Sequence, residues 1–291
     1  MPEAIFTIGI SASGKTTWAH QQKGYIVLDS DQLRLEMYGS ETDQRDPHKV
    51  FDLMYKRGRE QLLEGKSVIF CSTNLSMKYR MHAIHQLSNI PNITFKAVIF
   101  NVPANVCREN NKKRARQVPD WLFERQIKQF QCPVVTEGFD SIEIITPFEY
   151  NQIEFAHSMW DDVRTAGSQD NPHHTLTLYD HLQACINKLN LSKLPIDDED
   201  SKNLCVAAAL HDVGKAYTRS YDENGIAHYY NHEAYGAYLT MNIHCRLEII
   251  QLVNYHMLPF NTSAIPTWKK RLGDDLWNKI MILHEADLAA K

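Results

Sequence analysis

Short apolar runs alternate with longer amphipathic stretches through the first half of the chain. The runs are too short for helices and end at turn-forming residues, so they predict strands at residues 4–8, 25–28, 67–71, 94–100 and 142–145. The stretches between them predict helices that begin at Gly14 and then cover residues 50–63, 77–87, 104–114 and 121–130. Strands separated by helices of this length predict an α/β domain with a parallel sheet wrapped by helices.

The second half of the chain has a different pattern. Beyond Pro147 the alternation stops, and helical periodicity dominates at residues 177–189, 202–210, 233–244, 247–255 and 268–288. Ten of the fourteen histidines follow Gln152. A length of 291 residues fits two domains. We therefore expect domains at 1–150 and 151–291, the second all-α, with residues 165–172 as a polar loop inside it.

Composition narrows the classes of protein that remain. A net charge of −4 argues against coating long stretches of nucleic acid, but it is compatible with gripping a strand end. The six cysteines are scattered singly without a CxxC pair, which argues against a zinc ribbon, and several lie in apolar runs where we expect burial. No signal peptide precedes the first strand, and no apolar run approaches the ~20 residues of a membrane span. We expect a cytoplasmic protein with no membrane association.

A phosphate-binding pattern follows the first predicted strand. Residues 9–16, Gly-Ile-Ser-Ala-Ser-Gly-Lys-Thr, fit G-x-x-x-x-G-K-[ST], with a strand before and a helix after. Backbone N–H groups of such a loop form an anion nest at a helix N-terminus. We expect ATP and Mg²⁺ here, with Lys15 on the β- and γ-phosphates and the Thr16 hydroxyl on the metal. The expected nucleotide-binding residues are Gly9, Ser11, Ala12, Ser13, Gly14, Lys15, Thr16 and Thr17.

Acidic residues directly follow the second predicted strand. A carboxylate beside a P-loop can accept the proton of an attacking hydroxyl, and Asp31 and Arg34 share one helix face at i,i+3 spacing. Arg34 could then hold an anionic group of the acceptor. The alternative is an N-cap aspartate with an exposed arginine. A basic cluster at residues 108–116 is either a dipole-complementing helix end or a lid, and we favour the lid.

These stretches resemble the phage-type polynucleotide 5′-hydroxyl kinases. The matching segments are residues 7–19, Asp31-x-x-Arg34, Ser72-Thr73-Asn74-Leu75, and Arg114 before Val118-Pro119. The resemblance implies Asp31 as the general base, Arg34 on the phosphate next to the acceptor nucleoside, and Arg114 as the lid arginine. The family often has an aspartate where Ser72 stands, and Asp29 could compensate, since an Asp-x-Asp pair also occurs in small-molecule P-loop kinases.

A histidine and an aspartate end an apolar stretch in the second half. Residues 204–210 are apolar on every side and predict a buried helix that runs into His211-Asp212-Val213-Gly214-Lys215. Buried imidazole and carboxylate groups are costly unless compensated, and a divalent cation compensates them. Lys215 shares a face with His211 and could meet a bound phosphate. Further candidates near other predicted helices are His181, His232, His256 and Asp287. Such ligands suit Mn, Fe, Co or Ni.

Jointly these residues resemble the HD superfamily of metal-dependent phosphohydrolases, over about residues 170–291. The resemblance implies His181, His211, Asp212 and Asp287 as metal ligands, and His232 and His256 as second-metal or phosphate contacts. Residues 171–181 resemble the opening segment of HD domains attached to tRNA-processing enzymes, with His173 and His174 left unassigned. A metal in this site would lower the pKa of a water and polarise a phosphoryl group, with Lys215 assisting.

A kinase and a phosphatase on one chain are useful together when they act on different ends of one molecule. The pairing resembles bifunctional end-healing enzymes, which phosphorylate a 5′-OH and remove a 3′- or 2′,3′-cyclic phosphate before ligation. We therefore expect single-stranded or nicked nucleic acid ends as substrate, RNA favoured, and an RNA ligase as functional partner. The runner-up is a metabolite or nucleoside kinase fused to an HD nucleotidase; basic residues at 108–116 and 269–271 weakly favour a polyanion. A third hypothesis is a nucleotide-switched regulator with a degenerate HD domain.

Overall fold

The computed structural model describes residues 1–172, 175–189 and 197–290. It forms two compact units, Met1–Gln126 with Pro133–Glu149, and Ile127–Cys132 with Tyr150–Lys291. The segment Ile127–Cys132 thus belongs to the second unit, although it comes from the first half of the chain. Two side chains of helix α12 hold it: Asn254 bonds the Cys132 N–H and the Phe130 carbonyl, and the Tyr255 hydroxyl donates to the Cys132 carbonyl.

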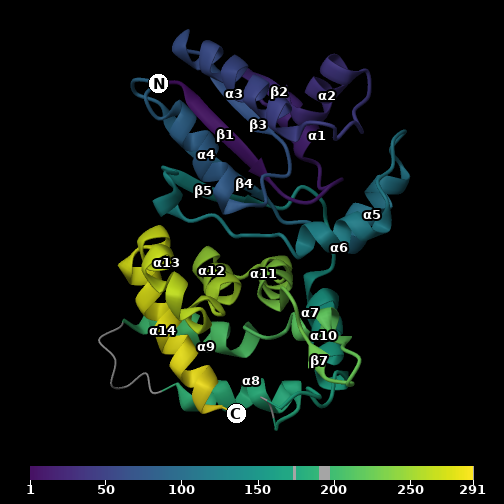
Figure 1. Ribbon diagram of the computed structural model, residues 1–291, viewed down its shortest axis with the longest axis vertical. Coiled ribbons are helices and arrows are strands. Elements are labelled where there is room, and N and C mark those ends of the chain that lie inside the picture. The colour runs from purple at the N-terminus through teal and green to yellow at the C-terminus, as the bar shows by residue number, and fades with distance from the viewer. Residues whose placement is uncertain (173–174, 190–196, 291) are drawn as a thin grey trace. The chain divides into compact units, whose positions relative to one another are not determined.

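The first unit is built on five strands, all parallel, in the order β2-β3-β1-β4-β5 (Figure 1). They are β1 Glu3–Ile8, β2 Tyr25–Asp29, β3 Ser67–Cys71, β4 Thr94–Phe100 and β5 Ser141–Ile145. Helices connect them: α1 Lys15–Gln21, α2 Ser30–Tyr38, α3 Pro47–Leu63, α4 Met77–Leu87, α5 Ala104–Lys112 and α6 Asp120–Ile127, with a 3₁₀ turn, η1 Val135–Glu137. The predicted α/β class is confirmed.

Alternating side chains of the central strands build a core on each face of this sheet. Ile5 packs in one cluster with Ala19 of α1, and the next residue, Phe6, stacks on Phe70 with ring centroids 5.0 Å apart. Since successive strand residues point to opposite faces, α1 covers one face of the sheet. On the other face Tyr55 of α3 packs against Phe70. The parallel sheet is therefore buried on both sides, as parallel sheets require.

Helices make up most of the second unit (Figure 1). They are α7 Gln152–Thr165, α8 Leu178–Lys188, α9 Asp198–Leu210, α10 Lys215–Thr218, α11 His232–Asn242, α12 Leu247–Tyr255, α13 Ile265–Leu272 and α14 Asp274–Ala289. Two 3₁₀ turns, η3 Leu258–Phe260 and η4 Thr262–Ala264, and a hairpin of β6 Ser220–Tyr221 and β7 Ala227–His228 complete it. The predicted helical class of this half is confirmed.

Three local expectations need correction. The single helix expected over residues 268–288 is two helices, because Gly273 between α13 and α14 has a φ of 82°, which interrupts the helical backbone. Helix α7 was not expected from the pattern. The stretch at 204–210 is not buried on every side, since Val206 is 37 % exposed, although Leu204 and Leu210 are buried.

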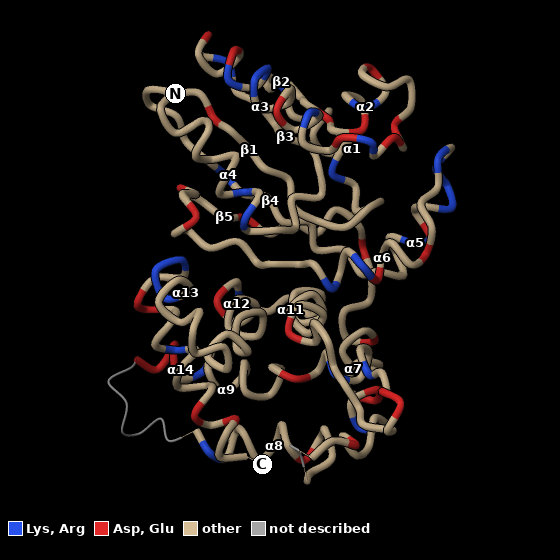
Figure 2. Tube along the Cα trace, viewed as in Figure 1, with Lys and Arg blue, Asp and Glu red and all other residues tan. Residues whose placement is uncertain are grey.

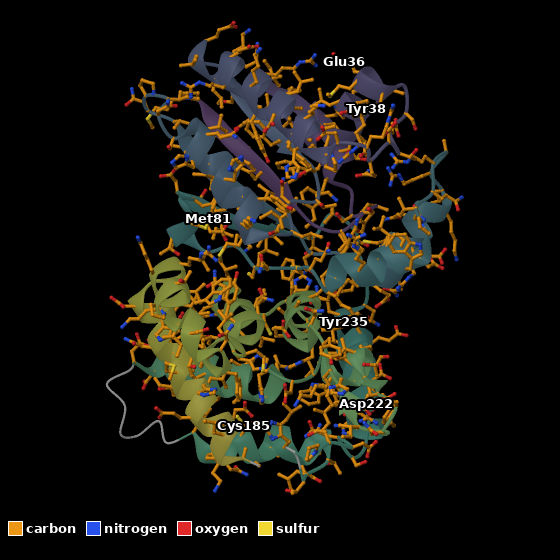
Figure 3. All side chains as sticks on the ribbon, in the orientation of Figure 1. Glu36, Tyr38, Met81, Cys185, Asp222 and Tyr235 are labelled. Atoms are coloured by element: carbon orange, nitrogen blue, oxygen red, sulfur yellow. The ribbon has the colours of Figure 1, made fainter. Side chains whose placement is uncertain are left out.

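Four of the six cysteines, Cys71, Cys107, Cys132 and Cys185, are buried as free thiols, as their apolar context predicted (Cys185 in Figure 3). Burial raises the pKa of the Cys71 thiol to about 11. They therefore pack as small apolar groups. Within the described part of the chain, no helix combines the length and the apolar character needed to cross a bilayer.

A fully buried ion pair ties α4 to the turn η1 in the first unit. Arg80 donates from Nε and Nη2 to the two carboxylate oxygens of Glu137, at 2.8 and 2.7 Å, and from Nη1 to the Asn74 carbonyl. Neither side chain is exposed to solvent. Burial raises the pKa of Glu137 despite the guanidinium beside it. The carboxylate therefore depends on Arg80 for its charge compensation.

We predict that Arg80→Met lowers the free energy of unfolding by about 3–5 kcal/mol, because it leaves Glu137 buried without its partner. Denaturant unfolding at pH 7 measures this difference. The matched control is Arg125→Met, at an exposed arginine of α6, which we expect to change stability by less than about 0.5 kcal/mol. Equal effects of the two substitutions would contradict the prediction.

Candidate phosphate-binding loop and metal centre

The loop between β1 and α1 has the backbone geometry of an anion nest. Ala12 and Gly14 have φ values of 60° and 90°, in the left-handed region, so neighbouring N–H groups turn toward one concavity. The Gly9 N–H donates to the Thr73 carbonyl at 3.1 Å, which fixes the loop to the end of β3. A Cβ at Gly9 would lie 2.9 Å from Ser13 Oγ and 3.1 Å from Phe100 Cβ, so a larger residue would displace Ser13.

Gln126 of α6 fastens the other side of this loop. Its Oε1 accepts the Ser11 N–H at 2.7 Å, and its Nε2 donates to Ser11 Oγ at 3.0 Å. The residue is buried. Nothing in the pattern around residue 126 pointed to the loop, because the contact joins residues 115 positions apart. Gln126 is therefore a supporting residue that only the fold brings into the site.

Lys15 and Thr16 open helix α1 directly after the loop. The Lys15 ammonium donates to the Ile10 carbonyl at 2.6 Å and to Ser13 Oγ at 3.2 Å. Burial lowers the pKa of Lys15, and the positive charge of Arg114 acts in the same direction. The Thr16 hydroxyl donates to Asp29 Oδ2 at 2.9 Å. A hydroxyl beside a carboxylate next to a phosphate nest is the donor set that Mg²⁺ prefers.

The Asp31 carboxylate forms ion pairs with two arginines. Arg34 Nη1 lies 2.7 Å from Oδ1, and Arg116 Nη1 lies 3.3 Å from Oδ2 and 3.1 Å from a carboxylate oxygen of Glu41. The buried Nε–H groups of both arginines have no partner among the described residues. Arg34 is buried rather than exposed, so the alternative of an exposed arginine is excluded. The N-cap of α2 is Asp29, which accepts the Asp31 N–H at 2.8 Å.

The basic cluster lies at the end of α5 and in the segment that follows it (Figure 2). Sequence reasoning singled out Arg114 from this cluster. In the structure the charge of Arg114 contributes to lowering the pKa of Lys15, whereas Arg116 forms an ion pair with Asp31. Two arginines of one segment thus approach the two expected reaction partners, the phosphate loop and the carboxylate. Choosing between them needed side-chain geometry, because Arg114 and Arg116 differ in position by only two residues.

The loop after β3 is rigid and polar. Asn74, with a φ of 43°, donates to the Thr7 carbonyl at 2.9 Å, and its Oδ1 accepts the Ser72 hydroxyl at 2.7 Å. The Ser72 hydroxyl is therefore hydrogen-bonded within its own loop. The only carboxylate on the Thr16 hydroxyl within the described residues is that of Asp29.

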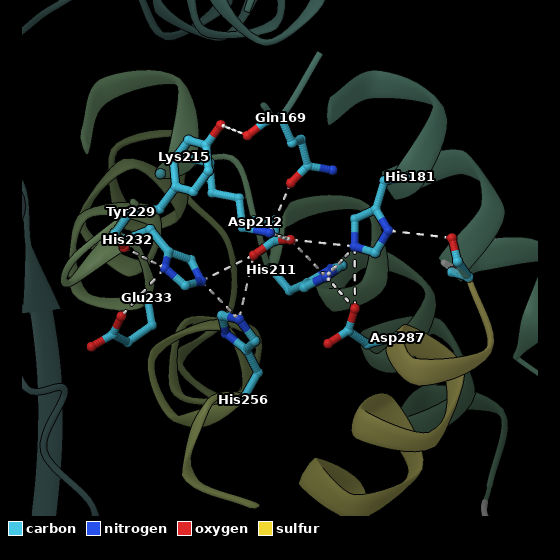
Figure 4. A network of polar contacts seen from close by, with 12 residues as sticks. Gln169, His181, His211, Asp212, Lys215, Tyr229, His232, Glu233, His256 and Asp287 are labelled. Atoms are coloured by element: carbon cyan, nitrogen blue, oxygen red, sulfur yellow. Dashed lines mark hydrogen bonds and ion pairs between the residues drawn. The ribbon is translucent and has the colours of Figure 1, made fainter. Parts of the chain in front are cut away.

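Five helices or helix ends of the second unit bring a buried polar cluster together (Figure 4). One group is His181, His211, Asp212 and Asp287, and the other is Asp212, His232 and His256. Asp212 Oδ2 lies 3.3 Å from His181 Nε2 and 3.5 Å from His211 Nε2. Its Oδ1 lies 3.0 Å from His232 Nε2 and 3.5 Å from His256 Nε2. Asp212 belongs to both groups and would be shared between two metal ions if both positions were filled.

The hydrogen bonds at Nδ1 of the four histidines indicate which tautomer each imidazole adopts. Nδ1 of His211, His232 and His256 lies 2.9, 2.8 and 2.7 Å from the carbonyls three residues earlier, Ala208, Tyr229 and Val253. Nδ1 of His181 lies 3.4 Å from the Ala290 carbonyl. A carbonyl only accepts, so each Nδ1 carries the proton. In the neutral rings the Nε2 lone pairs then point at each other and at carboxylates, an arrangement that a divalent cation satisfies.

One glycine lets the cluster close. A Cβ on Gly214 would lie 2.0 Å from the His232 carbonyl oxygen and 2.7 Å from the Gly236 nitrogen. Because Gly214 has no side chain, the start of α11 lies against the turn after α9. This close approach brings His232 within hydrogen-bonding distance of Asp212.

The charges of the cluster depend strongly on each other. Burial by itself raises the pKa of Asp212, but Lys215, His211 and the other imidazoles hold it well below its ordinary value. Burial likewise opposes ionisation of Asp287, yet hydrogen bonds from His181 and His211 hold its pKa below the ordinary range. Burial lowers the pKa of His181, and the two carboxylates outweigh it and raise that pKa to about 9. Both carboxylates are therefore ready to bind a cation at neutral pH.

Lys215 extends the cluster to Gln169, a residue that the sequence pattern did not single out. Its Nζ lies 2.6 Å from Asp212 Oδ2 and 2.9 Å from Gln169 Oε1, and 5.6 Å from the ring centroid of Tyr229. Sequence reasoning expected His211 and Lys215 on one face, and the contact of Lys215 is with Asp212. Gln169 lies in the stretch expected as a polar loop, where no spacing or periodicity distinguishes it. His173 and His174 lie outside the described residues.

We predict that Mn²⁺ binds the second unit more tightly as the pH rises from 7 to 9, by up to about tenfold per pH unit, and that the gain ends above pH 9. The reason is that the metal must displace a proton from His181, whose pKa is about 9 without metal. Calorimetric titration in buffers of different ionisation enthalpy measures affinity and proton release. His157→Ala, at an exposed histidine of α7, is the control. An affinity that stays constant over this range would exclude the mechanism.

Both units match known protein families. Residues 5–133 match the AAA domain model, and residues 173–290 match the HD domain model. A protein from Schizosaccharomyces pombe called a bifunctional polynucleotide phosphatase/kinase is 26 % identical over 155 residues, 50 % of this chain and 34 % of that protein. The chain thus spans about a third of the length of this curated relative.

Two solved structures share segments with the chain. A chain in the structure of the Pnkp1/Rnl/Hen1 RNA repair complex has a TM-score of 0.40 and 20 % identity, over 48 % of this chain and 46 % of that one. A putative kinase from Chloroflexus aurantiacus has a TM-score of 0.42 and 18 % identity, over 56 % and 97 %. The first unit, with its P-loop pattern and parallel five-stranded sheet, is similar to the AAA domain family over residues 5–133, and the helical second unit is similar to the HD domain family over residues 173–290.

Proposed function

We propose that this chain is a bifunctional end-healing enzyme for polynucleotides, RNA favoured. Residues 1–150 would phosphorylate a 5′-OH with ATP, and residues 151–291 would remove a 3′- or 2′,3′-cyclic phosphate. The observation that carries the proposal is the pairing, in one chain, of a P-loop beside Asp31 with a bridged His/Asp cluster. The name of the relative in Schizosaccharomyces pombe pairs the same two activities in one protein.

In the kinase half, the proposal gives each expected side chain one role. The nest of residues 9–16 would hold the ATP phosphates, and Lys15 would neutralise them. Thr16 with Asp29 would hold Mg²⁺. Asp31 would take the proton of the 5′-OH, and Arg34 would bind the neighbouring phosphate through its free Nε–H. Arg114 and Arg116 would provide positive charge from the segment after α5.

In the hydrolase half, His181, His211, Asp212 and Asp287 would hold one divalent metal, and His232 and His256, with the second oxygen of Asp212, a second. The metal would be Mn, Co, Ni or Fe, which suit imidazole and carboxylate ligands together. Bound metal supplies Lewis acidity and an activated water for phosphate-ester hydrolysis. The backbone carbonyls on Nδ1 orient the rings, and Lys215 places a positive charge beside the bridging carboxylate.

The two activities complement each other chemically. Many nucleases leave a 5′-OH on one end and a 3′- or cyclic phosphate on the other, whereas ligases need a 5′-phosphate and a 3′-OH. A kinase and a phosphatase acting on the same substrate group would cancel, but on opposite ends they convert unligatable termini into ligatable ones. An RNA ligase is therefore the functional partner that the proposal implies.

We predict that the protein changes both ends of a short RNA carrying a 5′-OH and a 3′-phosphate, given ATP, Mg²⁺ and Mn²⁺. Mass spectrometry of the product reports each end. Lys15→Ala should abolish the gain of a 5′-phosphate and leave the loss of the 3′-phosphate unchanged, because Lys15 belongs to the phosphate loop of the first unit. Asp212→Ala should have the opposite effect, because Asp212 bridges both candidate metal positions.

Each variant is thus the control for the other. If neither end changes while nucleosides or small phosphate esters react, the polynucleotide substrate is wrong and a small-molecule kinase–nucleotidase takes its place. Raising the salt concentration separates the two cases further. Binding of an RNA end through several phosphates weakens with salt, whereas binding of a nucleoside does not.

We predict that Asp31→Asn slows 5′-phosphorylation by about 10²–10⁴-fold, the usual contribution of a general base. The affinity for ATP should stay the same, because the carboxylate contacts Arg34 and Arg116 and not the phosphate loop. Initial rates with an RNA 5′-OH and equilibrium binding of labelled ATP measure the two quantities. Asp52→Asn, at an exposed aspartate of α3, is the control. A normal rate in Asp31→Asn would rule out this carboxylate as the base.

A further inference from the structure

Gln169 is a buried amide with one hydrogen-bonding group unused. The residue is 1 % exposed, and its Nε2 has no partner among the described residues. Its Oε1 accepts from Lys215 Nζ at 2.9 Å. A buried N–H donor without an acceptor is unfavourable, so its presence beside a candidate metal centre points to a ligand that accepts from it.

The direction of the amide is determined by its neighbour. Amide oxygen and nitrogen can be exchanged by rotating the group, but an ammonium offers only donors. Lys215 therefore requires the oxygen of Gln169 to face it and the nitrogen to face away. In Figure 4 this nitrogen points to the side of the cluster on which His181 lies.

The loop that carries Gln169 is held in place from three sides. The Arg219 guanidinium donates to the Ala166 and Ser168 carbonyls at 2.8 and 2.7 Å. The Tyr229 hydroxyl donates to the carbonyl of Gln169 itself at 2.7 Å. The Tyr221 hydroxyl donates to the Asp170 carboxylate at 2.9 Å. These four hydrogen bonds preorganise the position of the amide.

Gln169 and the first metal position are connected through one residue. Lys215 contacts both Gln169 Oε1 and Asp212 Oδ2, the oxygen that faces His181 and His211. The ammonium and the unused N–H are thus two donors near the cluster, at opposite ends of the Gln169 amide. Two donors, one charged, near candidate metal positions suit a group that only accepts and carries negative charge.

We propose that Gln169 binds substrate: its Nε2–H donates to a non-bridging oxygen of the phosphoryl group that the HD domain hydrolyses, with Lys215 beside it. The inference rests on the proposed function of this unit as a phosphohydrolase. It makes Gln169 a binding residue for phosphate monoesters and their product, inorganic phosphate. Lys215 has two roles in it, since it both neutralises the anion and aligns the amide.

The test replaces the donor without removing the contact to Lys215. Gln169→Glu keeps an oxygen for the ammonium but presents a negative oxygen where the N–H was, and Gln169→Leu removes the donor without adding charge. Inorganic phosphate is titrated calorimetrically into the Mn²⁺-loaded full chain. All proteins carry Lys15→Ala, so that phosphate at the P-loop does not contribute. The matched control is Gln183→Glu, at an exposed glutamine of α8.

We expect phosphate affinity to fall about tenfold or more in Gln169→Glu and by several-fold in Gln169→Leu, with bound Mn²⁺ and the control unchanged. Unchanged affinity in Gln169→Glu, or no phosphate binding by the parent protein, would overturn the inference. Loss of Mn²⁺ together with phosphate would overturn it too, because Gln169 would then support the metal ligands.

The RNA assay separates this inference from the proposed function. If phosphate binding depends on Gln169 but the RNA 3′-phosphate survives, the subsite is real and the proposed substrate is wrong. If the RNA end is processed and phosphate binding ignores Gln169, the proposed function survives and the inference fails.

Discussion

The carboxylate of Asp212 holds the second unit's site together. Buried among four imidazoles and an ammonium, it faces one pair of rings with each oxygen and contacts Lys215 at 2.6 Å. A buried charge of this kind is tolerated only where every neighbour compensates it. Helices α8, α11 and α14 each carry a candidate metal ligand, and α9 and α12 each end directly before one. The packing of these helices and the electrostatics of the cluster therefore depend on each other.

Backbone N–H and C=O groups are part of both candidate sites. In the second unit, carbonyls three residues earlier hold the Nδ1 protons of His211, His232 and His256, two of these rings standing at helix ends whose carbonyls lack intrahelical partners. In the first unit, N–H groups of a loop with two left-handed residues form the phosphate nest. Both devices are local, because the protein groups that form each of them lie within a few residues of one another. Such sites can be recognised as motifs for this reason.

The parallel sheet supplies what the motifs lack in the first unit. All five strands end at one edge, so the loop after β1, the acidic start of α2 and the loop after β3 are gathered there. Thr16 then meets Asp29, and Thr73 meets Gly9, across separations of 13 and 64 residues. Asp29 caps the N-terminus of α2 and accepts a hydrogen bond from the Thr16 hydroxyl, whereas Asp31 forms ion pairs with Arg34 and Arg116.

The sequence by itself predicted the two fold classes, the phosphate-loop pattern, the six residues that the structure gathers in the two clusters, and Lys215, because each belongs to a local pattern or to a recognised family motif. It also placed Asp31 beside Arg34, since i,i+3 spacing on a helix is local. Only the tertiary structure distinguished Arg116 from Arg114, recruited Gln126 and Gln169, and grouped Ile127–Cys132 with the second unit. Those contacts join residues far apart in the chain, and a glutamine in a polar loop carries no periodicity or spacing until the fold places a lysine against it.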